Sequence, residues 1–195
     1  MPKPPDFEFK DRRRLRGESS KKAIVQAALA LLEEGTLQPT IQQIAQRAGV
    51  GTRTYFRHFG DDDSLFVEVN KEIYESSARL FAGGDRSGPL EKRVAACISH
   101  RSEAYEQVGN LILSTQVMFW NSSILRENLA RAQADMRSDL EDWLPELRTL
   151  SPEKREAIEA ITSFDCWHRL RAYQQLTKDR AVSALVTMVN QTLGQ

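Results

Sequence analysis

The sequence has few cysteines and no long apolar run. Its 195 residues include two cysteines, Cys97 and Cys166, which are too few for a disulfide framework. The longest apolar stretch, LILSTQVMFW at residues 111–120, falls well short of the roughly 20 residues that a membrane-spanning helix needs. The N-terminal residues lack the apolar core of a secretory signal. We therefore expect no membrane span and a location in the reducing cytoplasm.

Residue sets that build catalytic or metal sites are also scarce. Glycine-rich phosphate-binding loops are absent. Cys97 and His100 lie about one helical turn apart, but no third and fourth metal ligand follows at a recognisable spacing. Cys166 and His168 project about 200° apart on a helix, so they do not face one ligand. We expect no enzyme, metal or cofactor; a helical enzyme or interaction module stays open as an alternative.

Charge is balanced overall but uneven along the chain. The sequence carries 27 Lys and Arg and 27 Asp and Glu, for a formal net charge of zero. Residues 1–60 hold 11 Lys or Arg against 6 Asp or Glu, whereas residues 61–195 hold 16 against 21. A basic N-terminal third indicates a polyanionic partner there. The alternative is an uneven spread of unrelated surface charges.

Helical periodicity runs through the whole sequence. Apolar residues recur at three- and four-residue intervals from Ile24 to Leu32, after possible N-caps at Ser19 and Ser20 and before Gly35. Similar patterns predict helices at residues 40–47, 51–59, 61–82, 89–108, 125–143, 151–167 and 182–193. No alternation of polar and apolar residues indicates a strand. We expect an all-α protein of about nine helices.

Two of the short predicted helices form a helix-turn-helix pattern in the segment TIQQIAQRAGVGTRTYFRHF. Ala45 is small where the helices cross, and Gly49 follows four residues later, where the turn needs a left-handed backbone. The second helix then presents Thr52, Arg53 and Thr54 at its start, where such helices reach base edges in the major groove. The alternative is a helical hairpin that only packs.

A basic segment precedes the first predicted helix. Arg12, Arg13, Arg14 and Arg16 make it too charged to pack, and residues 1–18 are expected to form a flexible arm. Such arms follow the phosphate backbone or enter an adjacent minor groove. Beside a helix-turn-helix, the segment favours DNA as the partner.

The stretch from residue 19 to residue 66 resembles the DNA-binding domain of the TetR family of bacterial transcriptional regulators. Three motifs carry the resemblance: an alanine-rich first helix, T-x-x-x-I-A-x-x-A-G-V, and an aromatic-R-H-F ending before a fourth helix. The resemblance implies a three-helix DNA-binding domain at residues 19–63 and a larger helical domain at residues 64–195 for dimerisation and ligand binding. It also implies a homodimeric repressor that a small molecule releases from a palindromic operator.

The resemblance also assigns roles to single residues. It implies phosphate contacts for Thr40 and His58 and base reading for Arg53 and Thr54, while Thr52, Arg57 and the arm are expected to add contacts to DNA. Phe56 stands where many members have a phosphate-binding tyrosine, so the neighbouring Tyr55 is expected to supply the missing hydroxyl. Asp62 stands where a lysine is usual, and it lies in an aspartate run that suits a helix start.

The last predicted helix has two apolar stripes. One contains Val182, Val186 and Val189, and the other contains Ala181, Ala184, Leu185 and Met188. A helix that is apolar on two sides needs two packing partners. We therefore expect a homodimer formed through the last two helices, the alternative being a fully buried helix in a monomer.

Large or polarisable side chains on the later helices are candidates for an effector pocket. Such residues, with a few polar groups among them, line apolar ligand sites. The alternative reading of each one is plain core packing. The candidates are Cys97, His100, Tyr105, Met118, Phe119, Trp120, Trp143, Phe164, Trp167 and His168. They predict a small hydrophobic or aromatic effector.

Three hypotheses from different classes follow. The first is a ligand-responsive, sequence-specific DNA-binding regulator. The second is an architectural DNA binder without an effector, and the third is a helical enzyme or interaction module whose hairpin is only structural. A palindromic footprint separates the first two from the third, and loss of that footprint with a small molecule separates the first from the second.

Overall fold

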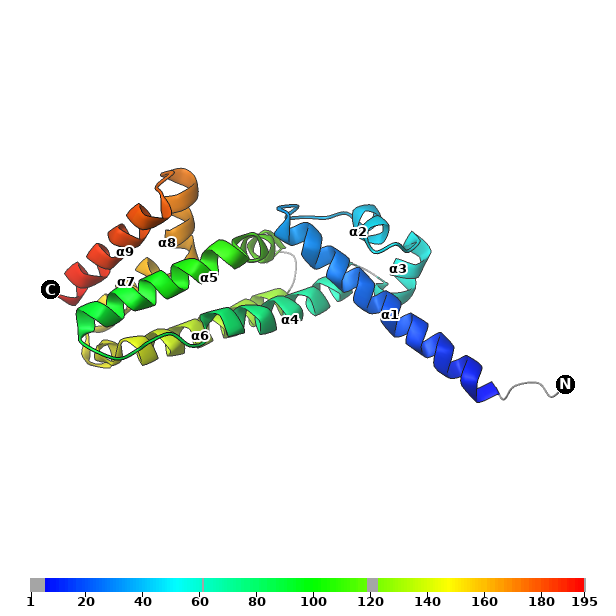
Figure 1. The fold of residues 1–195 in the computed structure, drawn as a ribbon, viewed down its shortest axis with the longest axis horizontal. Helices are drawn as coiled ribbons and strands as arrows, with labels where there is room; N and C mark the ends of the chain where they lie inside the picture. The colour runs from blue at the N-terminus through cyan, green and yellow to red at the C-terminus, as the bar shows by residue number, and fades with distance from the viewer. Residues whose placement is uncertain (1–5, 61, 119–122, 195) are drawn as a thin grey trace. The chain divides into compact units, whose positions relative to one another are not determined.

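The computed structural model describes the backbone of residues 6–60, 62–118 and 123–194, and their side chains except those of residues 6–14, 16, 62, 63, 123 and 124. Regular structure in these ranges is helical throughout, which confirms the prediction of an all-α protein (Figure 1). None of the described helices has the length and apolar character needed to cross a bilayer. The elements are α1 (Asp6–Glu33), α2 (Ile41–Arg47), α3 (Thr52–Phe59), α4 (Asp62–Phe81), α5 (Leu90–Met118), α6 (Ser123–Trp143), the 3-10 turn η2 (Pro145–Thr149), α7 (Pro152–Ile161), α8 (Phe164–His168), the π-helical turn η3 (Arg169–Tyr173) and α9 (Lys178–Leu193).

The chain forms two compact units, Met1–Ile73 with Asn110–Leu125, and Tyr74–Gly109 with Arg126–Gln195. The division lies inside α4, whereas the sequence pattern predicts it at residue 63. Residues 110–118 join the first unit because they pack there: Asn110 Nδ2 donates to the Glu33 carbonyl at 2.9 Å. The boundary between units is therefore set by packing, not by a helix end.

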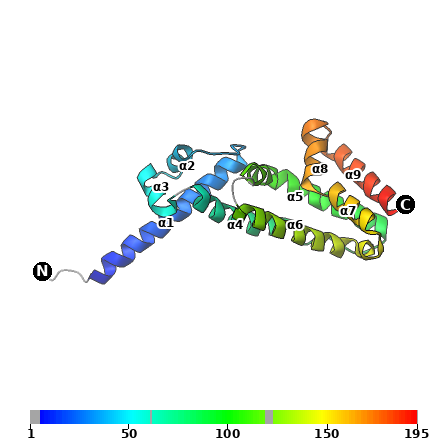
Figure 2. The same cartoon turned by 180° about the vertical axis from the view of Figure 1, so that it is seen from behind.

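The first unit contains the predicted three-helix arrangement, in which α2 and α3 both pack on α1 (Figures 1 and 2). Its core is formed by small and branched side chains that lie one or two turns apart on each helix, as the helical period requires. The buried apolar residues are Ile24, Val25, Ala27, Ala28 and Leu32 of α1, Ile44 and Ala45 of α2, Tyr55 and Phe59 of α3, Leu65, Val69 and Ile73 of α4, Leu111 of α5 and Leu125 of α6.

The first helix is longer than the sequence pattern predicts. It begins at Asp6, so the backbone of residues 6–18 is helical and not a flexible arm. Three prolines at positions 2, 4 and 5 end just before this start, and the following residues include many good helix formers. Leu15 is 59% exposed, which shows that this part of α1 lies outside the core of its unit.

The second unit is built around the first part of α5. The Tyr105 ring contacts Phe81 of α4 and Phe164 of α8, with centroids 5.3 and 5.6 Å apart. The Tyr105 hydroxyl donates to the Thr162 carbonyl at 2.9 Å, which ties α5 to the end of α7. The aromatic residues of α5 and α8 therefore act as core.

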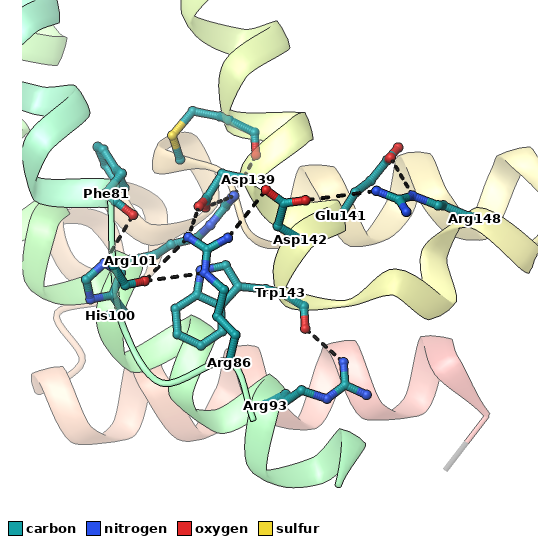
Figure 3. A network of polar contacts seen from close by, with 12 residues as sticks. Phe81, Arg86, Arg93, His100, Arg101, Asp139, Glu141, Asp142, Trp143 and Arg148 are labelled. Atoms are coloured by element: carbon teal, nitrogen blue, oxygen red, sulfur yellow. Dashed lines mark hydrogen bonds and ion pairs between the residues drawn. The ribbon is translucent and has the colours of Figure 1, made fainter. Parts of the chain in front are cut away.

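A polar network lies within this second unit (Figure 3). Asp139 of α6 accepts from Arg86 at 2.6 Å and from Arg101 of α5 at 3.1 Å. Arg101 also donates to the Met136 carbonyl at 2.6 Å, and only 4% of its side chain is exposed. One carboxylate thus accepts hydrogen bonds from two guanidinium groups, one of which is buried.

Candidate nucleic-acid interface

The second helix begins with the predicted capping box. Gln43 N donates to Thr40 Oγ1 at 3.3 Å, and Thr40 N donates to Gln43 Oε1 at 2.8 Å. The Thr40 hydroxyl also lies 2.9 Å from Gln43 Oε1, to which it donates. Thr40 is exposed at the N-terminus of α2, where the unpaired amides favour an anion.

The turn between α2 and α3 has the left-handed glycine that the sequence predicts. Gly49 has a φ of 66° and donates to the Gln46 carbonyl at 3.1 Å. Val50 N donates to the Ala45 carbonyl at 3.0 Å. These two bonds form a Schellman motif, which ends α2 and sets the direction of the chain into α3.

The third helix has one exposed and one buried face. Thr52, Arg53, Phe56 and Arg57 are exposed, at the i, i+1, i+4 and i+5 spacing of one helical face. Thr54 is half-buried. The exposed face combines two guanidinium groups with a hydroxyl, which are donors suited to phosphate oxygens and guanine edges.

Tyr55 does not belong to the exposed face. Its side chain is fully buried, and its ring centroid lies 5.8 Å from that of Phe59 and 5.6 Å from that of Phe56. Tyr55 and Phe59 lie four residues apart, so they point into the core together. The expectation that Tyr55 supplies a hydroxyl to DNA is therefore wrong, and Phe56 is the aromatic residue at the surface.

His58 lies at the edge of the exposed face and is half-buried. Partial burial, then the positive charges of Arg57 and Lys21, lower the pKa of His58 below its ordinary value of 6.5. An Arg57 Nη2 atom lies 3.4 Å from His58 Nε2. Because arginine only donates hydrogen bonds, this contact requires an unprotonated Nε2. The ring is therefore neutral near pH 7 in the free protein.

The predicted effector residues with described positions are divided between the two units. Cys97, Tyr105, Trp143, Phe164 and Trp167 are buried in the second unit. There His100 contacts the ring of Trp143, and His168 stacks on Phe164. Met118 lines a cavity of the first unit, while Phe119 and Trp120 lie outside the described residues.

The cavity of the first unit has an empty volume of about 210 Å³, including the part that is open to solvent. Its lining comes from α1, α4, α5 and α6. The lining residues are Leu32, Phe66, Val69, Asn70, Ile73, Ser114, Thr115, Met118 and Leu125. Of these lining residues, sequence reasoning named only Met118 as a pocket candidate; the signal it missed was the polar pair Ser114 and Thr115 one turn before Met118.

Neither cysteine has the lowered thiol pKa of a nucleophilic cysteine. Burial raises the pKa of Cys97 to about 11 and also raises the pKa of Cys166. Both are therefore protonated thiols near neutral pH, whereas a reactive cysteine is a thiolate. Within the described ranges, no group of three or more His, Cys, Asp or Glu side chains is placed to hold a metal ion.

Comparison with known proteins identifies the first unit. A family model described as "Bacterial regulatory proteins, tetR family" matches residues 24–69, which run from α1 through α2 and α3 into α4. This match and the similar proteins described below support a TetR-family regulator. The resemblance predicted from the sequence motifs is thus confirmed, and a family of regulatory proteins agrees with the expectation of a non-enzymatic protein.

Two curated relatives are similar to this chain. An HTH-type transcriptional regulator, BetI 1 of Chromohalobacter salexigens, is 30% identical over 118 residues, or 58% of this chain and 57% of that protein. BetI of Paraburkholderia xenovorans is 26% identical over 115 residues, or 56% of this chain and 57% of that protein. The chain spans little more than half the length of these relatives.

Solved structures of regulators have the same fold. A transcriptional regulator from Rhodococcus sp. Rha1 has a TM-score of 0.68 at 17% identity, covering 91% of this chain and 96% of that chain. A tetR-family transcriptional regulator from Streptomyces coelicolor has a TM-score of 0.64 at 15% identity, covering 88% of this chain and 80% of that chain. The fold likeness therefore extends over both units of this protein.

Proposed function

We propose that this TetR-family chain is a sequence-specific DNA-binding transcriptional regulator, and that it acts as a homodimeric repressor released from a palindromic operator by a small molecule. The observation that carries the proposal is the exposed face of α3, where Thr52, Arg53, Phe56 and Arg57 point away from the core. A helix of this kind fits the major groove, which is about 12 Å wide. Arg53 near its N-terminus is placed to donate two hydrogen bonds to guanine.

The N-terminal part of α1 supports this proposal as a phosphate contact. Lys10, Arg12, Arg13, Arg14 and Arg16 fall within seven residues of the helix. A helix with side chains is about 10–12 Å across, whereas the minor groove is only about 6 Å wide. As a helix this segment contacts the outside of the backbone, so it adds affinity without base specificity.

Dimerisation is proposed through the last two helices, α8 with η3 and α9. Ala181, Leu185 and Val189 of α9 are buried within their unit. Val182, Ala184, Val186 and Met188 are only half-buried, and no charged residue follows Arg180. A second copy that covers this uncharged, partly apolar surface would complete a four-helix arrangement.

The effector is proposed to be a small hydrophobic or aromatic molecule. The cavity beside Met118 is bordered by α1 and α4, the helices that adjoin α2 and α3 in the sequence. Its lining is mostly apolar with Asn70, Ser114 and Thr115 among the apolar groups, which is typical of ligand sites. A ligand there could shift α1 against α4 and so alter the position of α3.

Selection of bound duplexes from random DNA tests the proposal. Purified full-length protein is incubated with the pool at a stated salt concentration, and bound sequences are recovered and footprinted. A palindromic site that is protected on both half-sites supports a homodimeric regulator. Recovery of random sequences with equal affinity would refute sequence-specific binding. Screening small apolar molecules for loss of the footprint then tests release.

Arg53→Ala is expected to cost about 1–3 kcal/mol of binding free energy at a single base-pair position of each half-site. The reason is that the guanidinium of Arg53 is exposed on the first turn of α3, where side chains reach base edges. The measurement is the Kd for the selected site and for its single-base variants. The variant protein should no longer distinguish the bases at that position.

Arg57→Ala is the matched control, because Arg57 is also exposed on the same face but lies in the last turn of α3. Its loss should weaken binding to all sequences alike and lower the salt slope by about 1, as expected for a phosphate contact. A uniform loss from Arg53→Ala would instead assign Arg53 to phosphate.

DNA binding is expected to strengthen as the pH falls through the region around and below 6.5. In the free protein, burial and the charges of Arg57 and Lys21 hold the pKa of His58 below 6.5. A phosphate beside the ring favours the imidazolium, so the pKa is higher in the complex and binding takes up a proton. The measurement is the Kd at fixed ionic strength over a pH series.

His58→Gln should flatten this pH profile, because glutamine can still donate a hydrogen bond but does not titrate. His100 and His168 remain in the variant, so any pH dependence of the Kd that they cause is still measured. An unchanged pH slope in His58→Gln would show that His58 is not the group that gains the proton.

A further inference from the structure

Phe56 is an exposed aromatic residue in the middle of the outward face of α3. Its side chain is 49% exposed, while Tyr55 and Phe59 on the same short helix are buried. Single exposed apolar side chains are common on protein surfaces. What distinguishes Phe56 is its place between Arg53 and Arg57 on the face that the proposed function directs toward DNA.

The Phe56 ring packs against the ring of Tyr55. Its centroid lies 5.6 Å from that of Tyr55, with an interplanar angle of 82°, which is a favourable edge-to-face arrangement. Tyr55 is itself fully buried, so the ring against which Phe56 packs has a fixed position. The ring is therefore pre-positioned to meet a surface and loses little conformational freedom on binding.

The apolar feature that the major groove of unmodified DNA presents is the 5-methyl group of thymine. Phe56 lies one turn after Thr52 and between Arg53 and Arg57 on the face that the proposed function directs into the groove. It has no hydroxyl or charge with which to bind a phosphate. The chemistry of the ring thus matches the methyl group and no other group on the groove floor.

We propose that Phe56 contacts the 5-methyl group of one thymine in each half-site and so determines a preference for T·A at that position. The inference rests on the proposed function, because it requires α3 to lie in the major groove. It adds a base that is recognised by an apolar contact, beside the guanine assigned to Arg53.

Replacement of thymine by uracil in the selected duplex tests the inference. Uracil keeps the base pair and removes only the methyl group. Full-length protein should bind about fourfold more weakly when one particular thymine per half-site is replaced, the factor expected for one buried methyl group. Phe56→Ala should bind the thymine and uracil duplexes equally, whereas Phe56→Tyr, which keeps the ring, should still prefer thymine.

Arg53→Ala is the control for general weakening, since it should retain the preference for thymine over uracil. Circular dichroism checks that Phe56→Ala remains folded, as expected for a side chain that is half exposed. An equal thymine preference in wild type and Phe56→Ala would overturn the inference, and so would a wild type that is insensitive to every uracil. Failure to select any specific duplex would instead refute the proposed function itself.

Discussion

Gly84→Ala is expected to lower the free energy of unfolding by about 3 kcal/mol, or more. Gly84 has a φ of 83°, and a methyl group added there would lie 2.5 Å from two ring carbons of Trp143. Trp143 is 1% exposed, with the guanidinium of Arg86 5.0 Å from its ring and His100 5.8 Å away, so it has little room to move (Figure 3). Backbone strain and overpacking therefore act together. The measurement is urea unfolding followed by tryptophan fluorescence.

Gly83→Ala is the matched control for this change. Gly83 has a similar φ of 93°, but an added methyl group would meet no atom within 4 Å. It should cost only the left-handed backbone strain of about 1–2 kcal/mol. If both variants lost the same stability, the contact between Gly84 and Trp143 would carry no part of the effect.

The helix-turn-helix could be predicted from the sequence because its signals are local. A threonine and a glutamine three residues apart form the capping box of α2, and the pair needs no distant partner. The left-handed turn at Gly49 is equally local, since glycine adopts positive φ without a steric cost. Interactions between residues only a few positions apart can be predicted from the sequence, because they do not depend on a distant partner in the folded chain.

The assignment of Tyr55 to the DNA-binding surface failed because it depends on tertiary packing. Tyr55 and Phe56 are aromatic and adjacent, so composition does not tell which one is buried. The spacing to Phe59 does, because residues four apart on a helix share a face and Phe59 closes the core with Tyr55. The hydroxyl of Tyr55 was expected at the surface, but the register of α3 turns this side chain into the core and leaves Phe56 exposed.

The two units could not be separated from the sequence for a similar reason. The helical pattern of α4 runs past residue 73 without interruption, and the sequence pattern predicts α5 only to residue 108, although the helix continues to Met118. The sequence also does not show which aromatic residues of the second unit line a pocket, because core and pocket residues are of the same types. Only the contacts that each ring makes in the folded chain show whether it packs in the core or lines a pocket.

Asp139→Asn is expected to destabilise the protein by about 3 kcal/mol, because it leaves the buried Arg101 without a counter-charge. Arg101 has 4% of its side chain exposed, and its contact to Asp139 is 3.1 Å. Arg86 donates to the same carboxylate at 2.6 Å, so neutralising Asp139 also leaves two guanidinium groups facing each other (Figure 3). Asparagine keeps the size and one acceptor, which isolates the effect of charge. Urea unfolding at neutral pH measures the loss.

Asp142→Asn tests whether burial is the cause. Asp142 lies on the same helix and pairs with Arg86 at 3.6 Å and with Arg148 at 3.9 Å, but 59% of its side chain is exposed. Water screens such a pair, so its removal should cost less than about 1 kcal/mol. A large loss from Asp139→Asn beside a small one from Asp142→Asn shows that the desolvated guanidinium of Arg101 sets the energy. Equal losses would mean that Arg101 finds another counter-charge or water when Asp139 is neutral.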